Sequence, residues 1–230
     1  MKWLFRILVA IAIATLSSPA FAQSQGWDYW RWRFVAVAGD SSSVFCHPSE
    51  FGVSSDASDN YDDDQLIRTE GITSAVYAAT YHNHTSISDS WSGPTGFYDT
   101  DLCAPVPLRA GESKSWLIYL WATPGVPDTY DTISVSCLMI MPPFMPSEYD
   151  YTLTLAAKPS ATSGGPAIGT TWRLSLPSGV SVELPIYRTD NGLTGYQFEL
   201  TATAVPEPSS ILALLSGLVG IGGVAILRRK

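Results

Sequence analysis

The 230-residue sequence is poor in cysteine and lacks the common catalytic motifs. It has three cysteines, Cys46, Cys103 and Cys137, and no CxxC pair, so neither a zinc ribbon nor a dithiol redox site is predicted. In an oxidising compartment two of the three could pair, and the sequence leaves the choice of pair open. GxSxG, HExxH and phosphate-cradling glycine loops are missing as well, so we expect a protein that is not an enzyme.

Basic residues are scarce between positions 23 and 204. Five of the 13 Lys and Arg residues and one of the 21 Asp and Glu residues lie in the terminal segments, which leaves 8 basic and 20 acidic residues and a net charge of −12 between them. Such a charge disfavours nucleic acid and anionic lipid as partners. Cations, or a polyanionic matrix bridged by cations, fit it better, and solubility alone also explains it.

This central region shows no convincing amphipathic helix and no internal repeat; its patterns are those of strands. In residues 29–38 a period of two places Trp30, Trp32, Phe34 and Ala36 on one face and Arg31 and Arg33 on the other. Further short strands are expected within 71–82, 115–122 and 131–141, where β-branched, aromatic and apolar residues are bounded by Gly and Pro.

The last third, residues 171–204, predicts three strands separated by turn residues. Val182, Leu184 and Ile186 alternate with Ser181 and Glu183, and the same alternation recurs at Tyr196, Phe198 and Leu200. We interpret this stretch as an antiparallel meander with one buried face, in which Pro185 marks an edge strand or a bulge.

Eight to ten such strands predict an all-β fold, an antiparallel β-sandwich that is jelly-roll-like or immunoglobulin-like. The segments 47–70 and 89–114 are long and polar, and we expect them to be loops that carry any binding site.

The N-terminal segment has the three parts of a secretory signal peptide. Lys2 and Arg6 precede an apolar stretch, and Ala20-Phe21-Ala22 offers the small-x-small pattern that signal peptidase accepts. We therefore expect a signal peptide at 1–22, with cleavage after Ala22, and an exported domain at 23–204. The alternative, an N-terminal anchor, is disfavoured by Pro19 and the small residues around it.

An acidic stretch within the exported domain is a candidate calcium loop. Calcium prefers six to eight oxygen ligands from a flexible loop, and the spacing here differs from that of an EF-hand. The alternative is a solvated acidic loop. The candidate ligands are Asp56, Asp59, Asn60, Asp62, Asp63 and Asp64.

His82 and His84 lie two residues apart, so both would lie on one face of a strand. With a third ligand such as His47 or Cys46 they could bind zinc or copper, whereas two exposed histidines without a function are the simpler interpretation.

Tryptophan is the residue type that most favours sugar binding here. Trp116, Trp121 and Trp172 lie within expected strands and are predicted to be packing residues. Trp27 and Trp91 lie outside clear strands and are the candidates for stacking on sugar rings.

The C-terminal segment, 205–230, begins with Val205, Pro206, Glu207 and Pro208, continues with 19 uncharged residues at 209–227, and ends in Arg228, Arg229 and Lys230. As a helix, 19 residues rise roughly 28 Å, which is close to the thickness of the hydrocarbon core. The positive-inside rule would then leave the three basic residues in the cytoplasm. We therefore expect a transmembrane helix at 209–227 with the domain outside.

This combination resembles the PEP-CTERM sorting signal of Gram-negative bacteria, and the resemblance covers only 205–230. It implies recognition by an exosortase, a membrane transpeptidase that would cut near the VPEP motif after a transient stay in the inner membrane. It also implies a protein linked to exopolysaccharide or biofilm. We therefore expect a non-enzymatic protein of the envelope or extracellular matrix. The alternatives are a carbohydrate-binding module that uses exposed Trp and Ca²⁺, and a secreted hydrolase of polysaccharides.

Overall fold

The computed structural model describes residues 29–39, 44–54, 74–82, 95–103, 111–141, 149–174 and 179–205, all of which belong to one compact unit, Gly26–Val205. The regular structure of these residues is β-strand and one short 3₁₀ helix, so the expectation of an all-β fold is confirmed for the part of the chain that is described. The elements are β1 (Tyr29–Val37), β2 (Phe45–His47), β3 (Ser49–Ser54), β4 (Ala75–His82), β5 (Gly96–Tyr98), β6 (Thr100–Cys103), β7 (Ser113–Ala122), β8 (Thr132–Met141), β9 (Tyr149–Ala157), β10 (Thr171–Leu174), β11 (Val180–Pro185), η2 (Gly192–Thr194) and β12 (Tyr196–Ala204).

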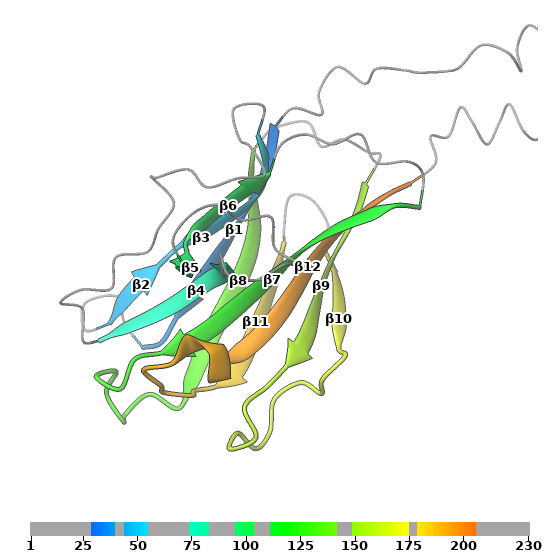
Figure 1. The fold of residues 1–230 in the computed structure, drawn as a ribbon. Helices are drawn as coiled ribbons and strands as arrows, with labels where there is room; N and C mark the ends of the chain where they lie inside the picture. The colour runs from blue at the N-terminus through cyan, green and yellow to red at the C-terminus, as the bar shows by residue number, and fades with distance from the viewer. Residues whose placement is uncertain are drawn as a thin grey trace, which may run out of the picture. The chain divides into compact units, whose positions relative to one another are not determined.

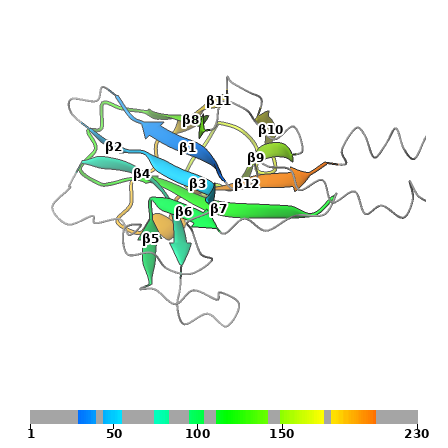
Figure 2. The same cartoon turned by 90° about the horizontal axis from the view of Figure 1, so that it is seen from above.

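The strands form two sheets (Figure 1, Figure 2). Sheet A has the order β11-β8-β1-β3-β6, and its neighbours are antiparallel except for the parallel pair β3 and β6. Sheet B has the order β10-β9-β12-β7-β4-β2, in which β2 alone runs parallel to its neighbour. β5 also pairs with β4. Because Thr80 pairs with both β7 and β5, β5 lies on the same edge of β4 as β2.

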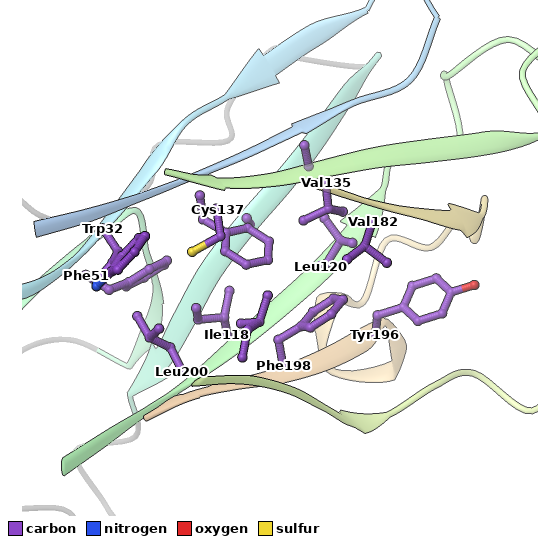
Figure 3. Packing of buried hydrophobic residues seen from close by; sticks show 14 of the residues in the cluster. Trp32, Phe51, Ile118, Leu120, Val135, Cys137, Val182, Tyr196, Phe198 and Leu200 are labelled. Atoms are coloured by element: carbon purple, nitrogen blue, oxygen red, sulfur yellow. The ribbon is translucent and has the colours of Figure 1, made fainter. Parts of the chain in front are cut away.

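Alternate residues of both sheets pack into one hydrophobic core (Figure 3). Trp32 and Phe34 of β1 are fully buried, as the period of two predicts, and Arg31 and Arg33 lie on the opposite, partly exposed face. Figure 3 shows Phe198 of β12 facing the β8 side of the core. Burying a side chain of this size stabilises the fold by about 1.5–3 kcal/mol, so the alternation fixes which face of each sheet turns inward.

The chain passes directly from sheet B to sheet A at two places. Pro48 alone separates β2 from β3, and Asp99 alone separates β5 from β6. Pro48 has no N–H to donate to a ladder, which explains why pairing with β4 stops there. At the second place the carbonyl of Asp99 accepts a hydrogen bond from the N–H of Glu50 at 2.7 Å. The two sheets are therefore joined along one side by strands that change sheet.

The prediction of a meander over residues 171–204 is wrong. The strands themselves and their alternation are present, with Val182 and Leu184 buried and Ser181 and Glu183 exposed. However, β10 pairs with β9, β11 pairs with β8 in the other sheet, and β12 lies between β7 and β9. Turn residues and alternation indicate where strands end and which face is buried, but they carry no information on distant partners.

Two further expectations concern Pro185 and the two long polar segments. Pro185 does lie in an edge strand, because β11 is the first strand of sheet A. The segments 47–70 and 89–114 are expected to be loops, but the first contains β3 and the second contains β5 and β6. These three strands have six residues or fewer, and a stretch that short gives too few alternating positions to be recognised.

Candidate functional site

The first residue of the VPEP motif, Val205, directly follows the last strand. β12 is hydrogen-bonded on both sides up to its end: Thr203 pairs with Ser113 of β7, and Ala204 pairs with Tyr149 of β9. The N–H of Ala204 donates to Glu112 at 2.9 Å, and its carbonyl accepts from Gly111 at 2.7 Å. The strand is thus bonded as far as the residue before the motif.

Burial holds the same end of β12 in place. Tyr196, Phe198, Leu200, Ala202 and Ala204 all face the interior, and even Ala204 is only 4 % exposed. The junction between domain and motif is therefore abrupt: the last core residue is position 204 and the motif begins at 205. Pro206, Glu207, Pro208, the predicted span 209–227 and the basic residues Arg228, Arg229 and Lys230 lie outside the described residues, as does the predicted signal peptide 1–22.

His82, one of the candidate metal ligands, takes part in a contact between the two sheets. Its Nε2 lies 3.1 Å from Oδ2 of Asp101 on β6, and its ring packs edge-on against Tyr98 at 5.4 Å. The Oγ of Ser49 on β3 donates to the carbonyl of Ala78 on β4, which links the sheets a second time. His82 therefore closes the side of the fold where the strands change sheet.

The metal hypotheses themselves stay predictions. Within the described part of the chain there is no group of three His, Cys, Asp or Glu side chains that could hold a metal ion. His84 and the side chain of His47 lie outside that part, as do the calcium candidates Asp56, Asp59, Asn60, Asp62, Asp63 and Asp64.

Most of the tryptophans are packing residues. Trp30, Trp32, Trp116 and Trp121 are at most 4 % exposed, and Trp172 is partly buried against the main core. The prediction that Trp116, Trp121 and Trp172 are packing residues is thus confirmed, with Trp121 in a smaller cluster separate from the main core. Trp27 and Trp91, the candidates for sugar stacking, lie outside the described residues.

The structure also contains an aromatic group that the sequence did not reveal. It lies on the face of sheet B opposite the main core, and we call it the outer aromatic cluster: Tyr77, Tyr81, Phe97, Tyr119 and Trp121. Tyr77 and Trp121 are buried and stacked at 5.2 Å, whereas the other three rings keep exposed area. Burial first, and the neighbouring Tyr81 second, raise the pKa of the Tyr119 hydroxyl. The sequence signal was the lack of alternation in β4, which is apolar or aromatic on both faces.

On the face of sheet A opposite the main core, two arginines share one carboxylate. Arg31 reaches one oxygen of Glu50 at 3.1 Å and Arg33 reaches the other at 2.7 Å. Partial burial acts to raise the pKa of Glu50, but the hydrogen bonds and positive charges of Arg33 and Arg31 outweigh it and lower that pKa. The arrangement neutralises a carboxylate on the β1–β3 pair and serves the stability of the sheet.

The two cysteines whose side chains the structure describes give no sign of a reactive site. Cys46 and Cys137 are free thiols, and the side chain of Cys103 lies outside the described residues. Burial raises the pKa of both described thiols, most strongly that of the fully buried Cys137. A neutral, buried thiol is a poor nucleophile, so Cys137 is a packing residue.

Comparison with known proteins adds no assignment: no family model matches the chain, and neither a curated protein nor a solved structure matches it. No described residue belongs to a helix that is long and apolar enough to cross a membrane.

Proposed function

We propose that this chain is an exported, non-enzymatic protein of the cell envelope or extracellular matrix, processed by an exosortase at its C-terminal sorting signal. The observation that carries the proposal is the order of features in the sequence: VPEP at 205–208, an uncharged run at 209–227 and the terminal RRK. Signal peptidase removes residues 1–22, the run 209–227 holds the chain transiently in the inner membrane, and the domain lies outside.

The position of β12 supports this assignment. A processing site must be reachable, and it must not remove part of the fold. VPEP begins one residue after Ala204, so a cut within it separates the membrane segment from an intact domain. We also propose that the domain belongs to the antiparallel β-sandwich class, jelly-roll-like or immunoglobulin-like, because residues of both sheets fill one common core.

Mass spectrometry of the protein from cells with and without an exosortase tests the processing step. We expect a mature protein that has lost Arg228, Arg229 and Lys230 only where the enzyme is present. A change of Glu207 to Gln, next to a control change of Glu199 to Gln on the exposed face of β12, tests whether the motif is read. Mature protein with an intact RRK end in the strain that has the enzyme would exclude the proposal.

A second candidate function, carbohydrate binding, is favoured by the outer aromatic cluster. Tyr81, Phe97 and Tyr119 present partly exposed rings on one sheet face, and such rings can stack on sugars. A glycan array of the exported protein tests it, with Tyr119→Ala as the variant and Thr203→Ala, on the same face, as its control. Equal glycan binding by the Tyr119→Ala variant and the Thr203→Ala control would show that the outer aromatic cluster is not the binding site.

Calcium would enter this second function through the acidic stretch. Calorimetric titration with Ca²⁺, before and after Asp62→Ala and Asp63→Ala, tests whether that stretch binds the ion. Absence of heat, together with an unchanged melting temperature, would leave a solvated loop.

A further inference from the structure

β12 is the strand that the sorting motif follows, and it occupies an inner position of sheet B. Figure 1 shows it between β7 and β9. Residues 196–203 are in register with β7 and residues 197–204 with β9, so the strand has no free edge. Every second side chain, down to Ala204, is also buried. No part of 196–204 is therefore open to a new partner while the domain is folded.

Enzymes that process a peptide hold it in an extended form, and they do so through backbone hydrogen bonds and pockets for alternate side chains. In residues 196–204 the backbone groups are already hydrogen-bonded to β7 and β9, and the alternate side chains are already buried in the domain. To offer Thr203 and Ala204 to an enzyme, the strand would have to leave β7 and β9 and expose core residues. Openings of this kind in the centre of a sheet approach global unfolding in their free energy.

We infer, on the basis of the processing proposed above, that the folded domain sets the N-terminal limit of the cut. The processing enzyme binds the chain only from Val205 onward, so its selectivity comes from VPEP and the residues after it. The bond that breaks lies C-terminal to Val205. The new carboxyl end takes an oxygen from water or forms an amide with an acceptor amine, and the released tail keeps a free amino group.

The same geometry fixes what the mature protein retains. The mature protein keeps the whole of β12, and processing leaves both of its ladders intact.

Limited proteolysis of the purified full-length chain in detergent micelles, with mass spectrometry of the fragments, tests the limit without any exosortase. A broad-specificity protease should leave a domain whose C-terminal end lies at Val205 or beyond. Cuts within 196–204 are expected only in denaturant, which serves as the positive control for digestion. A cut within 196–204 under native conditions, in protein whose unfolding transition is intact, would overturn the inference.

A linker insertion tests it in cells that have the exosortase. Six residues, Gly-Ser repeated three times, are placed between Ala204 and Val205, so that VPEP and the span stay intact. The matched control has the same insertion between Gly164 and Gly165, in an exposed turn far along the chain from the motif. Pulse-chase labelling should show several-fold faster loss of the tail in the first protein and an unchanged rate in the second.

An unchanged rate in the Ala204–Val205 insertion would show that the domain does not restrict the enzyme, and would overturn the inference. If the wild-type tail stays intact in these cells, the proposed function fails, and the proteolysis result still decides whether the domain limits access.

Discussion

Replacement of Phe198 by Ala should destabilise the domain more than any surface change in the same strand. Phe198 is fully buried, and its ring centroid lies 5.5 Å from Phe34 of sheet A and 6.4 Å from Trp172 of sheet B. Its removal takes away a contact between the sheets and leaves a cavity that the surrounding strands fill only in part. Substitutions of this type cost about 3–5 kcal/mol, out of a total stability of roughly 5–15 kcal/mol.

Thermal and urea unfolding followed by tryptophan fluorescence measure this loss. For a domain of this size each kcal/mol lowers the melting temperature by about 2–4 °C, so the expected decrease is about 6–20 °C. Glu199→Ala is the control, because Glu199 is the next residue of the strand and is exposed; its effect should stay within about 0.5 kcal/mol. Equal effects of the two variants would refute the assignment of faces in β12, and with it the view that Ala204 is held in the core.

Three further changes test other parts of the fold. The arginines lower the pKa of Glu50 only in the folded state, so the ionised side chain stabilises the wild type above the ordinary Glu pKa of about 4.3, and this contribution is lost as the pH falls. Glu50→Gln should remove the contribution, and urea unfolding from pH 2 to 7 should show the stabilities of the two proteins converging at acid pH. A difference that stays constant with pH would contradict the pairing. Cys137→Ala should lessen the loss of stability above pH about 8.5, where the unfolded thiol ionises and the buried one stays neutral; parallel alkaline curves would argue against its burial. Gly192→Ala should cost about 1–3 kcal/mol, since a Cβ at that position would lie 2.9 Å from the ring of Trp121; an unchanged melting temperature would mean that η2 does not rest on the outer aromatic cluster.

Side-chain alternation made the faces of the long strands predictable. Trp32 in β1 and Phe198 in β12 are buried where a period of two places them, because a strand turns successive side chains to opposite faces. Pro185 likewise indicated an edge strand, because proline has no backbone N–H to donate to a neighbouring strand. These properties depend on a few adjacent residues, and adjacent residues are what a sequence displays.

The pairing of strands was not predictable in the same way. Leu200 lies opposite Trp116, 84 positions earlier in the chain, and no local pattern specifies that partner. The outer aromatic cluster was missed for a related reason, because Tyr77 and Phe97 are brought together only once β5 pairs with β4. The candidate site was easier to predict, because VPEP is a contiguous motif. The structure was needed only to show that the motif begins directly after the last paired residue of β12.

The inner position of β12 also has a consequence for the order in which the sheet forms as the chain is made. A chain delivered N-terminus first presents β7 and β9 early, but the gap between them stays open until residues 196–204 arrive. Sheet B is therefore completed by the last stretch before the VPEP motif. A chain interrupted between β9 and β12 would lack this inner strand and expose two unpaired strand edges, which can pair with other chains and aggregate. Sheet B can therefore be complete only in a chain whose synthesis has reached the motif.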